Sequence, residues 1–179
     1  MRLLAPTFAA ALVLASAPAL ATLPVGAKAP DFSTRGAMAG KIVKVHLAEQ
    51  LRRGPVVLFF FPAAFTGGCN AQANAFSEAQ ADFRAAGATV IGMSADDVPT
   101  LQRFSTEKCA GKFAVASAGP AVVQKYDVAL GRQVQGRDVT NRTSYVIDRA
   151  GKIVLVHSNL DPAGHVAATL EAVRKLKKV

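Results

Sequence analysis

The chain has 179 residues, of which 21 are Lys or Arg and 12 are Asp or Glu, so its net charge is +9. This length allows one domain with a sizeable hydrophobic core. With 51% hydrophobic and 18% charged residues, the composition excludes an intrinsically disordered protein. Two cysteines are too few for a disulfide-rich scaffold or for a four-cysteine zinc or iron–sulfur site.

The first 21 residues have the features of a secretory signal peptide. Arg2 precedes the uncharged run 3–21, which ends in an A-x-A cleavage site at Ala21. An uncleaved membrane anchor is the alternative, because about 20 apolar residues can span a bilayer. The two prolines and the many alanines of the run argue against an anchor. We therefore expect a mature chain of residues 22–179, exported to a bacterial periplasm, forming a single domain and without stable membrane association.

The first predicted elements of the mature chain are two strands. Residues 41–47 (KIVKVHL) predict a strand, and Gly54-Pro55 marks the turn that follows it. Residues 56–61 (VVLFFF) form an unbroken apolar run of β-branched and aromatic side chains. Such a run is typical of a strand that is buried on both faces of a sheet.

A long amphipathic helix is predicted over residues 69–86. Phe76, Ala79, Phe83 and Ala86 recur at helical spacing on one face. Gly87 follows at the position where glycine commonly ends a helix.

The later elements alternate in the same way. The sequence predicts, in order, a strand at 88–93, a helix at 98–108 capped by Asp97, a strand at 113–116, a helix at 120–126, a hairpin of 143–148 with 152–158, and a last helix starting at Asp161-Pro162. Strands alternating with helices, followed by an antiparallel pair and a closing helix, predict a three-layer α/β sandwich with a mixed sheet. Ligands of open α/β sheets bind beyond the carboxyl ends of the strands, so we expect the site directly after Phe61.

Cys69 follows that buried strand and lies at the start of the predicted helix. Unpaired N–H groups and the helix dipole favour the thiolate there, as they do in reactive cysteines. Gly67 and Gly68 let the backbone approach a small ligand closely, and Thr66 offers a hydroxyl on the same side. A small buried hydrophobic residue or half of an inert disulfide is the alternative, but this setting favours a reactive thiol.

Three segments together resemble the peroxiredoxin family. Residues 62–69 (PAAFTGGC) are similar to the family motif P-x-x-x-[TS]-x-x-C, and residues 142–148 (RTSYVID) to its R-x-[ST]-[FY]-[VL]-I-D segment. Residues 26–32 (GAKAPDF) resemble its N-terminal G-x-x-A-P-x-F. The resemblance extends from about residue 25 to the C-terminus, implies a thioredoxin-like fold, and is strongest to an exported form of the bacterioferritin-comigratory (Q-type) subgroup.

The resemblance implies a role for each matching residue. Cys69 is implied as the peroxidatic cysteine, which attacks the O–O bond of the peroxide and becomes a sulfenic acid. Thr66 would hydrogen-bond the peroxide and Pro62 would shield the thiolate from water. Arg142 would stabilise the negative charge that spreads over sulfur and both oxygens in the transition state. A surface arginine at a strand entry is the alternative for Arg142.

The chain departs from the subgroup at two positions. Gln72 stands where many members have Glu, and Asn74 stands where a resolving cysteine is common. Cys109 is thus the remaining candidate, and its attack on the sulfenic acid would form an intramolecular disulfide with Cys69. A permanent structural disulfide between the two cysteines, or a one-cysteine mechanism with an external thiol, is the alternative.

The resemblance also implies the partners of an antioxidant enzyme. It implies hydrogen peroxide and organic hydroperoxides as substrates, a thioredoxin-like or small-thiol reductant, no cofactor or metal, and a monomer or dimer. His46, His157 and His165 lack the spacing of metal ligands. Basic and aromatic residues are not interleaved as in nucleic-acid-binding proteins, so we expect no nucleic-acid partner.

Three other functions compete with the peroxidase. A thioredoxin-like thiol–disulfide oxidoreductase uses C-x-x-C, but Thr66 and Gln72 occupy the positions where a second cysteine would pair with Cys69. A copper chaperone would need a second Cys and a His nearby. A non-catalytic redox-sensing or structural domain with a Cys69–Cys109 disulfide would not explain the presence of Thr66 and Arg142 at their motif positions.

Overall fold

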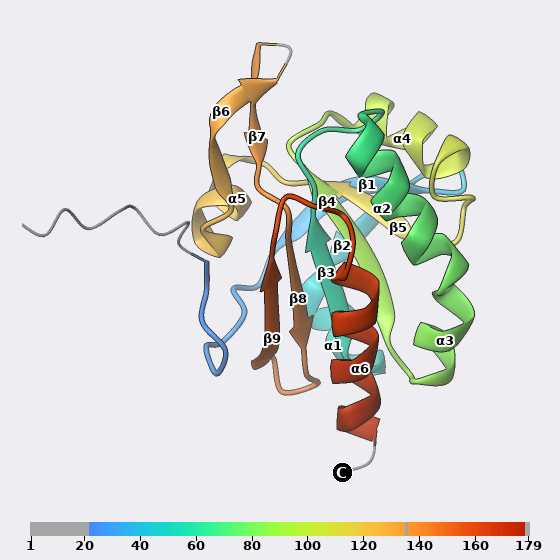
Figure 1. The fold of residues 1–179 in the computed structure, drawn as a ribbon, viewed down its shortest axis with the longest axis vertical. Coiled ribbons are helices and arrows are strands. Elements are labelled where there is room, and N and C mark those ends of the chain that lie inside the picture. The colour runs from blue at the N-terminus through green and yellow to red at the C-terminus, as the bar shows by residue number, and fades with distance from the viewer. Residues whose placement is uncertain (1–21, 135, 178–179) are drawn as a thin grey trace, which may run out of the picture.

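A computed structural model describes residues 22–134 and 136–177 (Figure 1). The expected signal peptide, residues 1–21, lies outside the described residues. Seven strands form the central sheet in the order β2-β1-β5-β4-β3-β8-β9, and β6 and β7 form a separate two-stranded hairpin. Among the described residues, no helix is both long and apolar enough to cross a membrane.

The elements have the following bounds. The strands are β1 (Ser33–Met38), β2 (Lys41–His46), β3 (Val56–Phe60), β4 (Thr89–Ser94), β5 (Ala114–Ser117), β6 (Ala129–Val134), β7 (Arg137–Thr140), β8 (Thr143–Ile147) and β9 (Ile153–Ser158). The helices are α1 (Leu47–Arg53), α2 (Gly67–Glu78), α3 (Gln80–Ala85), α4 (Val98–Glu107), α5 (Pro120–Tyr126) and α6 (His165–Lys177).

The central sheet is mixed, as predicted. Strands β3, β4 and β5 run parallel to one another, whereas β8 is antiparallel to β3 and β1 is antiparallel to β5. Every residue of β3 is buried. The strand predicted at 56–61 is thus confirmed as covered on both faces, although it ends one residue earlier, at Phe60. In an open sheet such a strand requires a layer of helices on each side.

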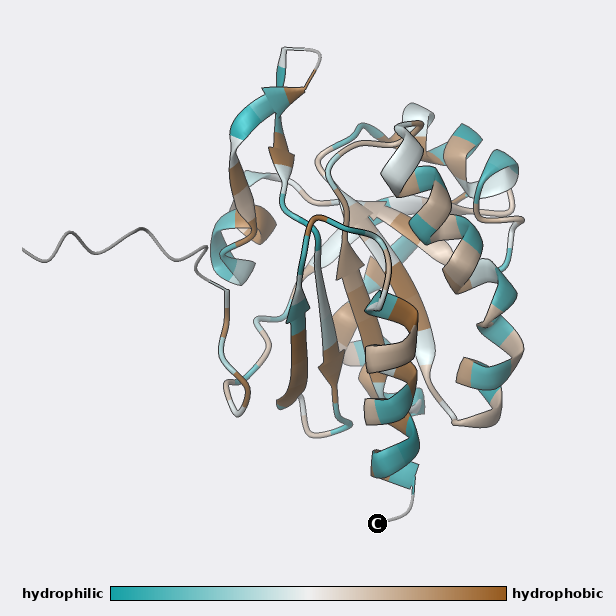
Figure 2. Cartoon of the chain, viewed as in Figure 1, coloured by the Kyte–Doolittle hydropathy of each residue, from teal (hydrophilic) through white to brown (hydrophobic). Residues whose placement is uncertain are grey.

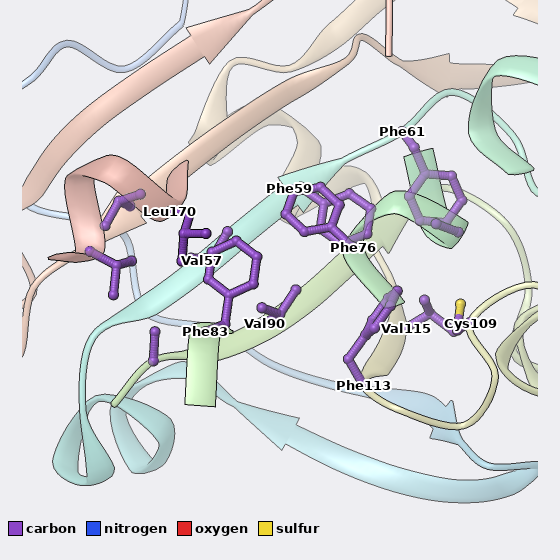
Figure 3. Close-up of a cluster of buried hydrophobic side chains, with 14 of the residues drawn as sticks. Val57, Phe59, Phe61, Phe76, Phe83, Val90, Cys109, Phe113, Val115 and Leu170 are labelled. Atoms are coloured by element: carbon purple, nitrogen blue, oxygen red, sulfur yellow. The ribbon is translucent and has the colours of Figure 1, made fainter. Parts of the chain in front are cut away.

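The two faces of β3 enter two separate hydrophobic clusters. Val57 and Phe59 belong to a cluster with side chains of α2, α3, α4 and α6, which is drawn in Figure 3. In that cluster Phe59 stacks on Phe76 of α2, with ring centroids 4.2 Å apart. Leu58 and Phe60 belong to a cluster with side chains of α1 and α5. The predicted three-layer sandwich is therefore confirmed, and Figure 2 shows its apolar central strands between helices with polar outer faces.

The helix predicted over 69–86 is two helices. It begins earlier, at Gly67, and is interrupted at Ala79, whose backbone (φ −81°, ψ 1°) leaves the helical range. Phe76 and Phe83 nevertheless point into the same cluster, because α2 and α3 cover the same side of the sheet (Figures 1 and 3). The apolar spacing therefore identified the buried face but not the break.

The start predicted for the last helix is wrong. Asp161 accepts a hydrogen bond from the backbone N–H of Ala163 at 2.9 Å, which closes a local turn, and Gly164 has φ +85°. A left-handed residue cannot continue a right-handed helix, so α6 begins at His165. The cap predicted for the helix at 98–108 is confirmed, because Asp97 accepts from the backbone N–H of Thr100 at 2.8 Å.

Four elements were not predicted. They are strands β1, β6 and β7 and helix α1. Each is short or lacks a clear helical or strand periodicity of apolar residues. Strand β1 has only two buried residues, and all residues of β6 are exposed or half-buried. Helix α1 has seven residues. Their positions depend on pairing with other strands and on packing against the sheet, which local sequence patterns do not reveal.

Candidate active site

Cys69 lies where the sequence places it, beyond the carboxyl end of β3. The parallel strands β3 and β4 end at the same edge of the sheet, where the backbone N–H of Phe61 donates to the carbonyl of Met93 at 2.9 Å. The chain then turns through residues 61–66 and enters α2, whose third residue is Cys69. Cys69 is only 1% exposed, so its thiol, in the first turn of α2, is almost completely shielded from solvent.

Cys69 lies at the N-terminus of α2, next to Thr66. Thr66 is the extended N-cap residue of α2, and its carbonyl accepts the first helical hydrogen bond from Asn70 at 2.8 Å. The N–H groups of the first turn have no partner within the helix and carry a partial positive charge toward the site. The hydroxyl of Thr66 donates to the carbonyl of Ala63 at 2.9 Å, so its oxygen lone pairs remain able to accept from a ligand.

Arg142 is the charged residue that the fold brings to Cys69. It is 5% exposed and lies in the connection between β7 and β8. Its Nη2 donates to the Cys69 Sγ at 3.6 Å, although the two residues are 73 positions apart in the chain. The alternative interpretation of Arg142 as a surface arginine is therefore wrong.

The other two guanidinium nitrogens of Arg142 also donate hydrogen bonds. Nε donates to the carbonyl of Leu160 at 2.8 Å, and Nη1 donates to Gln72 Oε1 at 2.5 Å and to the carbonyl of Gly68 at 3.4 Å. These acceptors fix the plane of the guanidinium so that Nη2 faces the sulfur. A Cβ at Gly68 would lie 3.0 Å from Nη2, so glycine here permits the close approach.

Gln72 is a neutral amide at a position for which the sequence resemblance implied Glu in many proteins of the subgroup. Its side chain is 1% exposed, and its oxygen accepts from Arg142. The charge of Arg142 is thus not neutralised by this neighbour. It stays available to the sulfur and to a negatively charged transition state.

Two buried polar side chains hold the loop before Cys69, and sequence reasoning missed both. Asp96 accepts from the backbone N–H of Ala64 at 2.7 Å, and it also accepts from Arg137 at 3.1 Å. The Thr140 hydroxyl donates to the carbonyl of Phe61 at 2.8 Å. Asp96 follows the carboxyl end of β4, the edge of the sheet where a ligand site was expected. A polar residue at that position could have indicated a role of Asp96 in the site.

Pro62 and Phe65 complete this loop. Pro62 is half-buried and borders a narrow recess with Asp96 and Arg137. Phe65 has φ 65°, a left-handed conformation that is rare for a residue with a bulky side chain and costs about 1–3 kcal/mol. Its ring packs edge-on against Phe104 at 5.3 Å, and the guanidinium of Arg103 lies 5.1 Å from its centre. The surrounding contacts thus maintain a strained backbone next to Thr66.

Cys109 is not brought to Cys69 in this conformation. It follows α4, is fully buried, and lies beside Phe113 and Val115 in Figure 3. Burial raises the pKa of its thiol to about 12. Its carbonyl accepts from the hydroxyl of Ser77, in the last turns of α2, at 2.8 Å. About 12 Å of helix separates Ser77 from Cys69, at 1.5 Å per residue.

Within the part of the chain that the structure describes, both cysteines are free thiols. The same residues contain no group of three or more His, Cys, Asp or Glu that could hold a metal ion. The sequence had named Cys69, Thr66, Arg142, Pro62 and Cys109 as site residues. The structure gathers the first three around the start of α2. It places Pro62 in the preceding loop and Cys109 beside the last turn of α2.

Comparison with known proteins gives a consistent result. The sequence pattern of the AhpC/TSA family matches residues 25–156. A Mycobacterium tuberculosis peroxiredoxin is 33% identical over 144 residues, which cover 79% of this chain and 89% of the relative. Chloroplastic peroxiredoxin Q of Oryza sativa is 30% identical over 152 residues, which cover 84% of this chain and 67% of the relative.

Solved structures agree with these relatives. Peroxidoxin BcpB from Mycobacterium tuberculosis superposes with a TM-score of 0.74 at 28% identity, covering 85% of this chain and 97% of that one. Peroxiredoxin Q of Xanthomonas campestris superposes with a TM-score of 0.68 at 24% identity, covering 80% and 90%, and supports the fold. With the family pattern spanning most of the chain and a cysteine poised at the start of α2, the protein belongs to the AhpC/TSA family and is a peroxiredoxin of the Q-type group.

Proposed function

We propose that this thiol-dependent peroxidase reduces hydrogen peroxide and organic hydroperoxides through Cys69, with Cys109 as the resolving thiol. The observation that carries the first part is the contact of Arg142 Nη2 with Cys69 Sγ at 3.6 Å in the first turn of α2. A fixed positive charge and a helix N-terminus on a nearly dry sulfur are the arrangement that a nucleophilic thiolate needs.

The oxidation step follows from this geometry. The Cys69 thiolate attacks one peroxide oxygen, an S–O bond forms, and the O–O bond breaks. The alkoxide or hydroxide that leaves takes up a proton and becomes an alcohol or water. Sulfur is oxidised to the sulfenic acid and the peroxide is reduced. Arg142 stabilises the charge on sulfur and oxygen, and the Thr66 oxygen accepts from the peroxide hydroxyl. Pro62 would limit the access of water from the side of the preceding loop.

The resolving step requires α2 to open. The Cys109 thiol attacks the sulfenic sulfur, water leaves, and a Cys69–Cys109 disulfide forms. Because a disulfide needs the two Cα atoms within about 7 Å, the first turns of α2 have to unwind from their present position. The same opening would expose Cys109, whose buried thiol is otherwise protonated. A thioredoxin-like protein or a small dithiol then reduces the disulfide.

Peroxide consumption with dithiothreitol or a thioredoxin system tests both parts. The Cys69→Ser protein should lose turnover with either reductant, and full activity in it would refute the peroxidatic role. The Cys109→Ser protein should lose turnover with thioredoxin while its Cys69 is still oxidised. Mass spectrometry after one equivalent of peroxide should show loss of two hydrogens in the wild type and a sulfenic or sulfinic acid in Cys109→Ser. Undiminished thioredoxin-dependent turnover in Cys109→Ser would refute the resolving role alone.

We further propose that the protein works in the periplasm after cleavage at Ala21, as a monomer or dimer. The basic residue, uncharged run and A-x-A site of the N-terminus support export. Fractionation of cells that express the full chain, with N-terminal sequencing of the recovered protein, should find residue 22 first in the periplasmic fraction. An intact N-terminus in the cytoplasm would contradict the proposal.

A further inference from the structure

The segment between β9 and α6 is bonded to Arg142 at two points. The carbonyl of Leu160 accepts from Arg142 Nε at 2.8 Å, and the backbone N–H of Asn159 donates to the Arg142 carbonyl at 3.1 Å. Leu160 is 44% exposed, so its side chain adds little packing to hold the segment. The position of the Leu160 carbonyl therefore depends on hydrogen bonds made by its neighbours.

His165 makes one of these bonds. It is the first residue of α6 and is fully buried. Its Nε2 lies 2.9 Å from the carbonyl of Asn159, directly before Leu160, and its Nδ1 lies 2.8 Å from the hydroxyl of Ser144. A carbonyl can only accept, so Nε2 carries the proton. In the neutral ring Nδ1 then accepts from Ser144, and the imidazole is held in one tautomer and one orientation.

We propose that His165 is a positioning residue for catalysis, which holds the Asn159–Leu160 peptide so that the Leu160 carbonyl can orient Arg142 toward Cys69. The proposal rests on the proposed peroxidase function. The ring of His165 is hydrogen-bonded to Ser144 and Asn159 and not to Cys69, so it would act through Arg142. Burial, together with the neighbouring His157 ring and the positive charge of Arg142, lowers the pKa of His165 to about 4, which keeps the His165 ring neutral at physiological pH.

A matched pair of variants separates this role from simple packing. Gln at position 165 carries an amide nitrogen near the place of the ring Nε2, whereas Met fills a similar volume without a donor. We expect His165→Met to slow the second-order oxidation of Cys69 by peroxide about tenfold, as for one lost hydrogen bond to a buried group. We expect His165→Gln to stay within about threefold of the wild type. Equal rates for Met and Gln would overturn the proposal.

The oxidation rate is measured in a single turnover by quenched flow and mass spectrometry, per folded protein as judged by circular dichroism. If His165→Met does not fold, His165→Asn replaces it, because the shorter amide can reach Ser144 but not Asn159. His46→Gln serves as the control and should oxidise at the wild-type rate, since His46 pairs with Asp31 near the surface, at 2.9 Å.

A double-mutant cycle tests whether His165 acts through Arg142. In an Arg142→Lys background, His165→Met should cause no further loss of rate, because the group it orients is already gone. The same tenfold loss in both backgrounds would overturn the proposal while leaving the peroxidase intact. Failure of the proposed function itself looks different, since the wild type would then show no oxidation of Cys69 at all.

Discussion

Arg142 is a buried cation, and such a group is tolerated only when its donors find acceptors. The Leu160 carbonyl, the Gly68 carbonyl and the Gln72 amide oxygen accept from Nε and Nη1, and Nη2 donates to Cys69. None of the three neighbours is an anion. The positive charge is thus held in place by neutral dipoles and stays directed at the sulfur, where a thiolate and then a charged transition state would use it.

Arg142→Lys should therefore lower the rate of Cys69 oxidation by about a hundredfold, the usual loss when one preorganised donor to a developing anion is removed. A lysine keeps the charge but cannot reach Leu160, Gln72 and the sulfur at once, because its ammonium lacks the planar fork of arginine. Single-turnover oxidation measures the effect. Arg149→Lys, on an exposed arginine that donates to the Arg52 carbonyl, is the matched control and should leave the rate unchanged. A rate for Arg142→Lys near that of the wild type would show that charge alone suffices.

At the scale of elements, the loop from Phe61 to Thr66 joins the buried strand β3 to α2 and is held from both sides. Asp96, beyond β4, accepts from the Ala64 N–H, and Thr140, at the end of β7, donates to the Phe61 carbonyl. The hairpin of β6 and β7, which stands apart from the main sheet in Figure 1, thus contributes to the site through Thr140 and through Arg137 on Asp96. The β6–β7 hairpin, which lies outside the main sheet, therefore helps to hold the loop from Phe61 to Thr66 in place.

Asp96→Ala should lower the free energy of unfolding by about 2–4 kcal/mol, because the Ala64 N–H and the Ser94 hydroxyl would be left buried without their acceptor. Urea unfolding of the reduced protein measures this value. Asp138→Ala removes a nearby exposed carboxylate and should change the stability by less than about 0.5 kcal/mol. Equal effects of the two substitutions would argue against a special role of Asp96 in holding the loop.

At the scale of the whole molecule, the buried neutral His165 links stability to pH. Its pKa is about 4 in the folded protein and 6.5 as an ordinary value, so between these pH values the unfolded chain binds a proton that the folded chain does not. Stability due to this group is present above pH 6.5 and is lost as the pH falls toward 4. The slope is at most about 1.4 kcal/mol per pH unit. His46 acts in the opposite direction, because its hydrogen bond to Asp31 raises its pKa.

A comparison of two proteins isolates the contribution of His165, since the effect of His46 is common to both. Urea unfolding across pH 4 to 7 should show a steeper loss of stability toward acid in the wild type than in His165→Gln, which has nothing to protonate at this position. Parallel curves for the two proteins would mean that His165 titrates in the folded protein as it does in the unfolded chain.

The fold class, a buried strand from Val56 and the place of Cys69 beside a helix start could all be predicted from the sequence alone. These depend on local patterns: an apolar run, helical spacing, and glycines before Cys69. The sequence also pointed to Arg142 and Thr66, but only through similarity to a family motif. Nothing in the local pattern around Arg142 shows which atoms will surround it.

The hydrogen bonds that hold Arg142 could not be predicted from the sequence and are seen only in the folded protein. Its acceptors lie between 18 and 74 positions away along the chain, on α2 and before α6. Asp96 and His165 likewise take their roles from partners on other elements. The physical reason is that burial and hydrogen-bond direction arise when distant segments pack together. A neutral histidine with a single tautomer, or a guanidinium aimed at one sulfur, exists only once they have done so.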